Sequence, residues 1–140
     1  MSAPLVPRVR VIAVCDESLV SETEADVFTL ENVRFDARVE TFPHWHELSV
    51  YLLFSHYRAG DFSGSIQITQ AATGRAIRYE RFDVSFDGRH EYRALCVDLP
   101  RCIFPLPGYY QLRGEGHRRR SGRIVQGRLH ADPALDGGRR

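Results

Sequence analysis

Short stretches in which apolar and polar residues alternate recur along the whole chain. Residues 27–42 (VFTLENVRFDARVETF) and 47–57 (ELSVYLLFSHY) are two clear examples. Alternation with a period of two is typical of a β-strand that has one face in a core and the other in solvent. Residues 9–16 (VRVIAVCD) are apolar in both phases instead. This indicates a strand that is covered on both faces.

Turn residues separate these stretches from one another. Glycine, proline or aspartate mark tight turns in ATGR at 72–75, at Asp87-Gly88 and in PLPG at 105–108. The expected strands are 9–16, 27–42, 47–57, 65–70, 76–86, 92–99, 109–113 and 122–130. No window has the helical period. We therefore predict an all-β, antiparallel β-sandwich of about seven to eight strands.

Several boundaries can be predicted more closely. The alternation changes phase about Glu31-Asn32 and again about Glu80-Arg81, and each change predicts a bulge or a turn. GDFSG at 60–64 is expected to be a turn, and Pro100-Arg101 is expected to end the preceding strand. By domain, we expect a flexible lead-in at 1–8, the sandwich at 9–130 and a disordered tail at 131–140.

The segment CIFPLPGYYQLRG at 102–114 predicts a corner between two strands. Pro105 and Pro107 cannot donate to a sheet ladder, and Gly108 can take a positive φ. Tyr110 and Leu112 then share one face of the next strand. A tyrosine at the mouth of such a strand commonly hydrogen-bonds the backbone at the corner.

Residues 65–70 (SIQITQ) carry neither charge nor proline, the two features that usually protect an exposed strand. At an edge, this strand would pair with a second copy or with a partner strand. The alternative is an interior strand that is paired by 48–54 and 76–82. The final strand is protected by Arg123 and Arg128.

Composition excludes several classes of function. The net charge of +1 gives no global attraction to nucleic acid or to an anionic membrane. The chain has no lysine, which excludes a Schiff-base lysine and a P-loop. The N-terminal residues lack a signal-peptide pattern, and the three cysteines are odd in number without CxxC spacing. We therefore expect a cytoplasmic protein with reduced thiols and no membrane partner.

The order VIAVCD, TLENVRF, TFP, LSVYLLF and FPLPGYYQLRG resembles a family of small bacterial proteins, a domain of unknown function. Its pattern places CD after the first strand and FP-x-PG-x-Y near the last hairpin, and the resemblance spans about residues 9–130. It implies an immunoglobulin-like sandwich, and the corner is also similar to the G-x-Y elbow of macroglobulin-type modules. The resemblance implies no activity.

FPHWHEL at 42–48 is the most chemically suggestive stretch. His44 and His46 are two residues apart, which puts both rings on one side of an extended segment. With Glu47, His56 or Asp61 as a third ligand they would suit zinc. The alternative is a polar loop with its tryptophan, Trp45, packed inward.

Two further stretches are candidates for binding or catalysis. HRRRSGR at 117–123, with Arg118 to Arg123, could bind phosphate or an acidic partner, or be a solvated hairpin tip. Cys15-Asp16 could be part of a nucleophilic set, or a buried thiol followed by a turn residue.

From these patterns we predict a non-catalytic binding or assembly module of the bacterial cytosol, without a cofactor and without catalytic or metal-binding residues. Its expected partner is a protein, itself or another, reached through an edge strand. The alternatives are a metal-dependent enzyme that uses His44 and His46, and a nucleic-acid or acidic-partner binder that uses the Arg118–Arg123 loop.

Overall fold

The computed structural model of the chain describes residues 7–34, 36–39, 41–117 and 124–133, with side chains placed for 7–34 and 41–114. All regular structure in this part is β-strand, so it contains no helix that could cross a membrane. The nine described strands are β1 (Arg8–Val20), β2 (Phe28–Arg34), β3 (Asp36–Val39), β4 (His44–Ser55), β5 (Gly60–Gln70), β6 (Ala76–Phe86), β7 (Tyr92–Phe104), β8 (Gly108–His117) and β9 (Ile124–Pro133).

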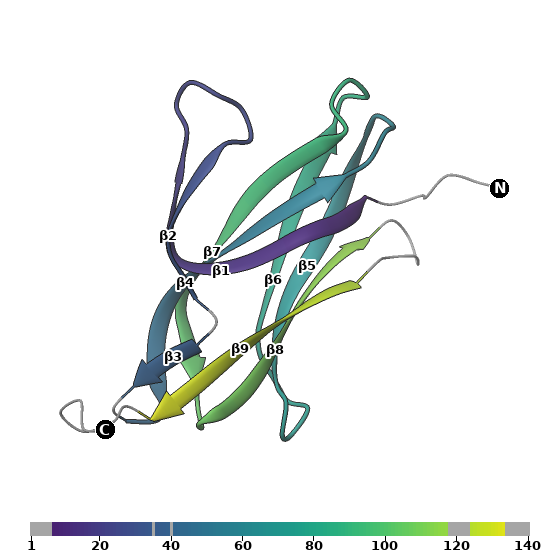
Figure 1. Cartoon of the computed structure of the whole chain (residues 1–140). Coiled ribbons are helices and arrows are strands. Elements are labelled where there is room, and N and C mark those ends of the chain that lie inside the picture. The colour runs from purple at the N-terminus through teal and green to yellow at the C-terminus, as the bar shows by residue number, and fades with distance from the viewer. Residues whose placement is uncertain (1–6, 35, 40, 118–123, 134–140) are drawn as a thin grey trace.

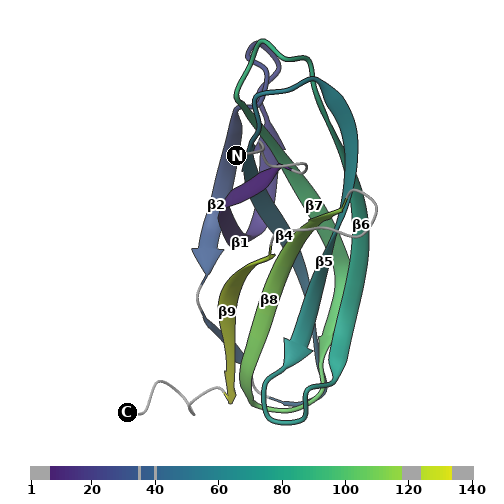
Figure 2. The same ribbon diagram turned by 90° about the vertical axis from the view of Figure 1, so that its right-hand side faces the viewer.

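The strands form two sheets, which Figures 1 and 2 show as separate layers. The first sheet has the order β2-β1-β4-β7, and the second has the order β3-β9-β8-β5-β6. Neighbouring strands are antiparallel, except for the parallel pair β3–β9. The predicted all-β sandwich is confirmed. The described strands outnumber the expected ones because residues 27–42 divide into β2 and β3, which lie in different sheets.

The core lies between the sheets and follows the alternation of the sequence. In β4, the side chains of Leu48, Val50, Leu52 and Phe54 are all at most 3% exposed. The second sheet contributes Ile66, Ile68, Phe82, Tyr110 and Leu112 to the same cluster. Phe54 and Phe82 meet across the layers with ring centroids 5.4 Å apart. Burial of these side chains is the main source of stability.

Several of the predicted strand limits and irregularities were wrong, and β1, for example, continues to Val20, beyond its predicted end at residue 16. GDFSG belongs to β5, because its Phe62 points into the core and pairs with Val84 of β6. Pro100-Arg101 lies inside β7, in a bulge where β7 has one residue more than the facing stretch of β4, and Arg101 takes a φ of 58° there. The β6 irregularity is at Ile77 rather than at 80–81, since Ile68 pairs with 78 and the next residue with 76.

The predicted irregularity at Glu31-Asn32 is neither a bulge nor a turn. Asn32 takes a positive φ of 56°, but β2 keeps one register with β1 from Phe28 to Arg34. Other local predictions agree with the structure. Gly74 and Gly88 have positive φ in the two predicted turns. β9 continues to Pro133, beyond the expected end of the domain at 130, whereas residues 1–6 and 134–140 lie outside the described part.

The prediction that 65–70 lies at an edge is wrong. β5 is hydrogen-bonded to β6 on one side and to β8 on the other. The alternative, an interior strand, correctly gave 76–82 as one neighbouring strand. It was wrong to give 48–54 as the other, because β4 lies in the other sheet. Among the described strands, the sheet edges are β2, β7, β3 and β6.

The corner at 105–108 is built as the sequence predicts. Tyr110 is fully buried, and its hydroxyl donates to the Leu106 carbonyl at 2.5 Å. The Leu106 N–H donates back to the same hydroxyl at 3.3 Å. Gly108 has a φ of 132°. The tyrosine therefore fixes the chain where it passes from β7 in one sheet to β8 in the other.

Gly108→Val is expected to lower the free energy of unfolding by about 1–3 kcal/mol, because a β-branched residue is strained at this φ. A Cβ at this position meets no atom within 4 Å, so the expected loss comes from the backbone alone. Urea unfolding measures it, with Gly108→Ala as the less strained comparison. A valine variant as stable as the wild type would show that the corner relaxes without cost.

Candidate functional site

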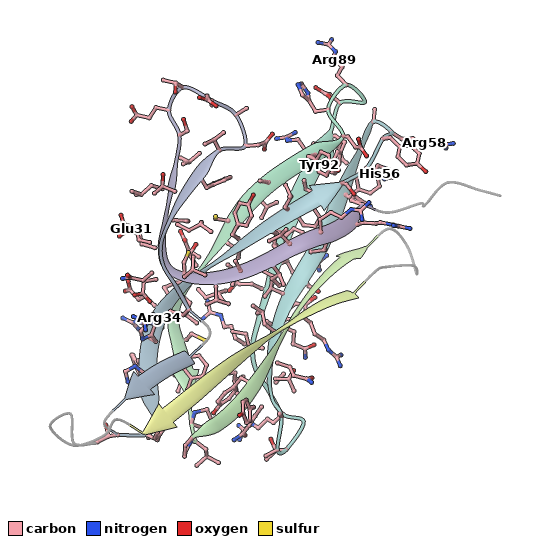
Figure 3. The ribbon with its side chains drawn as sticks, in the orientation of Figure 1. Glu31, Arg34, His56, Arg58, Arg89 and Tyr92 are labelled. Carbon is pink, nitrogen blue, oxygen red and sulfur yellow. The ribbon has the colours of Figure 1, made fainter. Side chains whose placement is uncertain are left out.

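Asp16 on β1 is the centre of a polar cluster at one end of the four-stranded sheet. Its carboxylate accepts hydrogen bonds from Arg34 Nη2 at 2.7 Å and from Asn32 Nδ2 at 3.1 Å, both on β2. On β4, His46 Nε2 lies 3.0 Å from Asp16 Oδ1. Because β2, β1 and β4 are neighbours, the sheet itself brings these groups together. Figure 3 labels Arg34 at this end. With His44, these residues are called the Asp16 cluster.

The environment of Asp16 favours its charged form. Hydrogen bonding from Arg34 is the main reason that the pKa of this carboxyl lies well below its usual range. Bonds from His46 and Asn32 act in the same direction, whereas burial opposes them. Asp16 is therefore a carboxylate at neutral pH, and its negative charge is held in place.

Asp16→Asn is expected to lower the free energy of unfolding at pH 7 by about 1–2 kcal/mol, since the cluster is partly exposed and solvent weakens its ion pairs. The folded-state pKa is depressed, so the stabilisation is present above the unfolded-state pKa of about 3.9 and is lost as pH falls below it. Urea unfolding at neutral pH and near pH 3 tests this. Asp83→Asn, on the exposed face of β6, is the control. An equal loss at both pH values would contradict the assignment.

His44 and His46 lie side by side, as their spacing predicts. His44 Nε2 is 3.4 Å from His46 Nδ1. Burial, and then the neighbouring ring of His46, lower the pKa of His44. Trp45 points away from both and is 57% exposed, so the prediction that it packs inward was wrong. The guanidinium of Arg101 lies over its ring, 5.7 Å from the ring centroid.

The structure does not group any of the three residues suggested as a third zinc ligand with His44 and His46. Glu47 is exposed and lines a separate hollow. His56 is buried against Phe62, at the other end of β4 (Figure 3). Asp61 accepts a hydrogen bond from Ser85 on β6. Within the described ranges, no three histidine, cysteine or acidic residues are grouped as metal ligands. In the described part of the chain, the zinc alternative therefore has the histidine pair without any of the three suggested third ligands grouped with it.

An open hollow of about 480 Å³ lies beside the Asp16 cluster, between β1, β4 and β7. Four carboxylates line it: Asp16, Glu17, Glu47 and Asp98. Asp16 is paired with Arg34, whereas the described part of the chain offers no ion-pair partner to the other three. Pro100 closes the side formed by β7. We call this feature the acidic hollow. Its charge favours a cationic group.

The acidic hollow borders an exposed apolar surface. Trp45 lies two residues before Glu47 on β4 and pairs with Ile103 of β7, which is 39% exposed. Arg101, which covers the tryptophan ring, follows the Pro100 that lines the hollow. An exposed tryptophan beside uncompensated charge is a common composition of protein-binding surfaces.

The cysteines have the character expected of buried thiols. Cys15 and Cys102 are fully buried, Cys96 is partly buried, and all three are free. Burial raises the pKa of each thiol, that of Cys102 to about 11. A raised pKa reduces the thiolate that a nucleophile needs, and the Cys15 thiol instead lies 3.5 Å from the Ser49 carbonyl. The geometry therefore gives Cys15 the buried role that was the alternative to a nucleophile, whereas the expectation that Asp16 is a turn residue was wrong, because it lies within β1.

Some candidates were missed, and one cannot be placed. Arg34, Asn32 and Asp98 were not predicted as site residues, because they look like ordinary exposed positions of alternating strands. Arg34 could be identified only from the pairing of β1 with β2, in which it lies opposite Val14. The loop residues 118–123 lie outside the described residues.

Comparison with known proteins does not place the chain in a family. No family model matches it, and no curated protein matches it. Among solved structures, a β-glucosidase from Listeria innocua aligns over 73% of this chain and 15% of its own, with 9% identity and a TM-score of 0.44. A β-glucosidase from Erythrobacter marinus aligns over 70% and 14%, with 12% identity and a TM-score of 0.43. Similarities of this size identify neither a family nor an activity.

Proposed function

We propose that the protein is a non-catalytic binding module that takes a basic segment of a partner protein in the acidic hollow. The observation that carries this proposal is the lining of the hollow. Glu17, Glu47 and Asp98 have no cationic partner within the described part, and Trp45 lies exposed beside them. An arginine or lysine of a partner would neutralise these carboxylates, while its neighbouring residues cover the tryptophan.

The position of the hollow in the sheet also supports protein binding. β7, which forms one wall, is an edge strand of its sheet. A partner segment that enters the hollow can therefore run along the edge of β7 and bond its backbone groups, apart from the Pro100 carbonyl, which accepts a hydrogen bond from Arg78 of β6 at 2.8 Å. Pro100 and the left-handed Arg101 interrupt that edge, so the contact is expected to be short.

We also propose that the sandwich is of the immunoglobulin-like kind. One supporting feature is that the chain passes from β2 in one sheet to β3 in the other, and that β3 pairs in parallel with the last strand, β9. The Tyr110 corner before β8 is a second supporting feature. The free cysteines support a reducing compartment such as the bacterial cytosol.

The experiment uses a short labelled peptide in which arginine alternates with serine, and the same peptide with glutamate in place of arginine. Fluorescence anisotropy of the arginine peptide should report binding that weakens with salt. The double variant Glu47→Gln/Asp98→Asn should bind about tenfold more weakly. The matched control is Asp61→Asn/Asp83→Asn, which removes the same charge from the other sheet. Equal affinity of both double variants for the arginine peptide, or binding of the glutamate peptide that Glu47→Gln/Asp98→Asn weakens, would contradict the proposal.

A further inference from the structure

A second hollow, of about 270 Å³, lies on the outer face of the five-stranded sheet. β5 contributes Gln67, Thr69 and Gln70, β8 contributes Gln111 and Arg113, and the β5–β6 turn contributes Ala71 and Gly74. Gln70 is buried, whereas the other lining residues on the two strands alternate with buried residues and point away from the core. We call this feature the polar hollow. The small turn residues leave space above the sheet.

Arg113 is the unusual member of the polar hollow. Its Nε is buried and, within the described ranges, has no hydrogen-bond partner. No carboxylate of that part forms an ion pair with its guanidinium either. A buried donor without an acceptor has lost its hydrogen bonds to water and has formed none within the protein. The burial of such a group therefore requires an explanation. An acceptor that is supplied from outside the chain is one.

The neighbours of Arg113 are also able to donate. Gln67 pairs directly with Arg113 across β5 and β8, and Gln111 lies opposite Thr69 one row away. Two side-chain amides and one hydroxyl can thus donate hydrogen bonds around one fixed positive charge. A carboxylate matches this set best, because its two oxygens fit the guanidinium side by side and its single charge balances that of Arg113. The volume of the hollow suits one such group with a small body attached.

We propose that the polar hollow binds a carboxylate group, with Arg113 as its ion-pair partner and Gln67, Thr69 and Gln111 as further hydrogen-bond donors. The carboxylate belongs to a small acid or to an acidic side chain of a protein. This site is on the sheet that does not contain the acidic hollow, and it has the opposite charge preference. A test of binding at the polar hollow is therefore independent of a test of binding at the acidic hollow.

The test is NMR titration of ¹⁵N-labelled protein with three probes at matched ionic strength: sodium glucuronate, glucose, and a short peptide in which glutamate alternates with serine. We expect glucuronate or the peptide to shift the amide signals of Gln67, Gln111 and Arg113, and glucose to leave them in place. Shifts with both acids indicate a small acid as the source of the carboxylate. Shifts with the peptide alone indicate an acidic protein segment.

Arg113→Gln should weaken this binding by about tenfold or more. Arg89→Gln, in the distant β6–β7 turn labelled in Figure 3, should not change it. Should the Arg113 variant fail to fold, Gln67→Leu provides a second test and should weaken binding several-fold. Equal shifts with glucose, no shift with any probe, or full binding by the Arg113 and Gln67 variants would overturn the inference.

Discussion

Replacing Tyr110 by alanine is expected to lower the free energy of unfolding by about 3–5 kcal/mol, because it empties a fully buried aromatic site. Tyr110→Phe should account for about 1–3 kcal/mol of this loss. The phenylalanine variant keeps the ring against Phe104, at a centroid distance of 5.0 Å, and removes only the hydroxyl. That hydroxyl both donates to and accepts from the backbone of Leu106, which would be left with unpaired polar groups.

Urea unfolding of both variants measures these losses. Tyr79→Phe is the control, because Tyr79 is 55% exposed on the outer face of β6 and should change stability by less than about 0.5 kcal/mol. If Tyr110→Phe were as stable as the wild type, the hydroxyl would not hold the corner, and one support for the immunoglobulin-like assignment would be lost.

Phe54→Ala is also expected to lower the free energy of unfolding by about 3–5 kcal/mol. Phe54 is fully buried and joins β4 to Phe82 on β6, so its removal opens a cavity between the two sheets. Phe54→Leu fills much of that space and should cost less than half as much. Val11→Ala is the control, since Val11 is 41% exposed on the outer face of β1. A loss below about 1 kcal/mol for Phe54→Ala would contradict the packing described here.

The alternation along the chain was sufficient to predict the sandwich and most of its strands. Period-two burial is a local property, and β4 and β6 follow it closely. The corner was also predictable, because proline and glycine restrict the backbone wherever they occur. The same holds for His44 and His46, which are two residues apart on one strand.

Strand pairing could not be predicted in the same way, because it depends on contacts far apart in the chain. Residues 65–70 lack protective charges since β5 is an interior strand, and the sequence alone does not separate that reason from an exposed edge. Pro100-Arg101 does not end β7, because pairing with β4 resumes on the far side of the irregularity. Asp16 meets Arg34 only once β1 and β2 are paired.

The two proposed sites show the same limit. Glu47 and Asp98 are distant in sequence, and they line one hollow because β4 and β7 are neighbours. Gln67 and Arg113 meet because β5 pairs with β8. In the sequence, each of these residues looks like an ordinary outward-facing residue of an alternating strand. Only the sheet topology gives them a common surface.

The most direct test of the proposed function uses Trp45, the single tryptophan of the chain. Because Trp45 is exposed on β4, two residues before the Glu47 that lines the acidic hollow, its fluorescence reports on this part of the surface. Titration with the unlabelled arginine–serine peptide should give a saturable change in emission that salt weakens and that Glu47→Gln/Asp98→Asn largely removes. Unchanged Trp45 emission at peptide concentrations where anisotropy shows binding would place the peptide elsewhere and contradict the account.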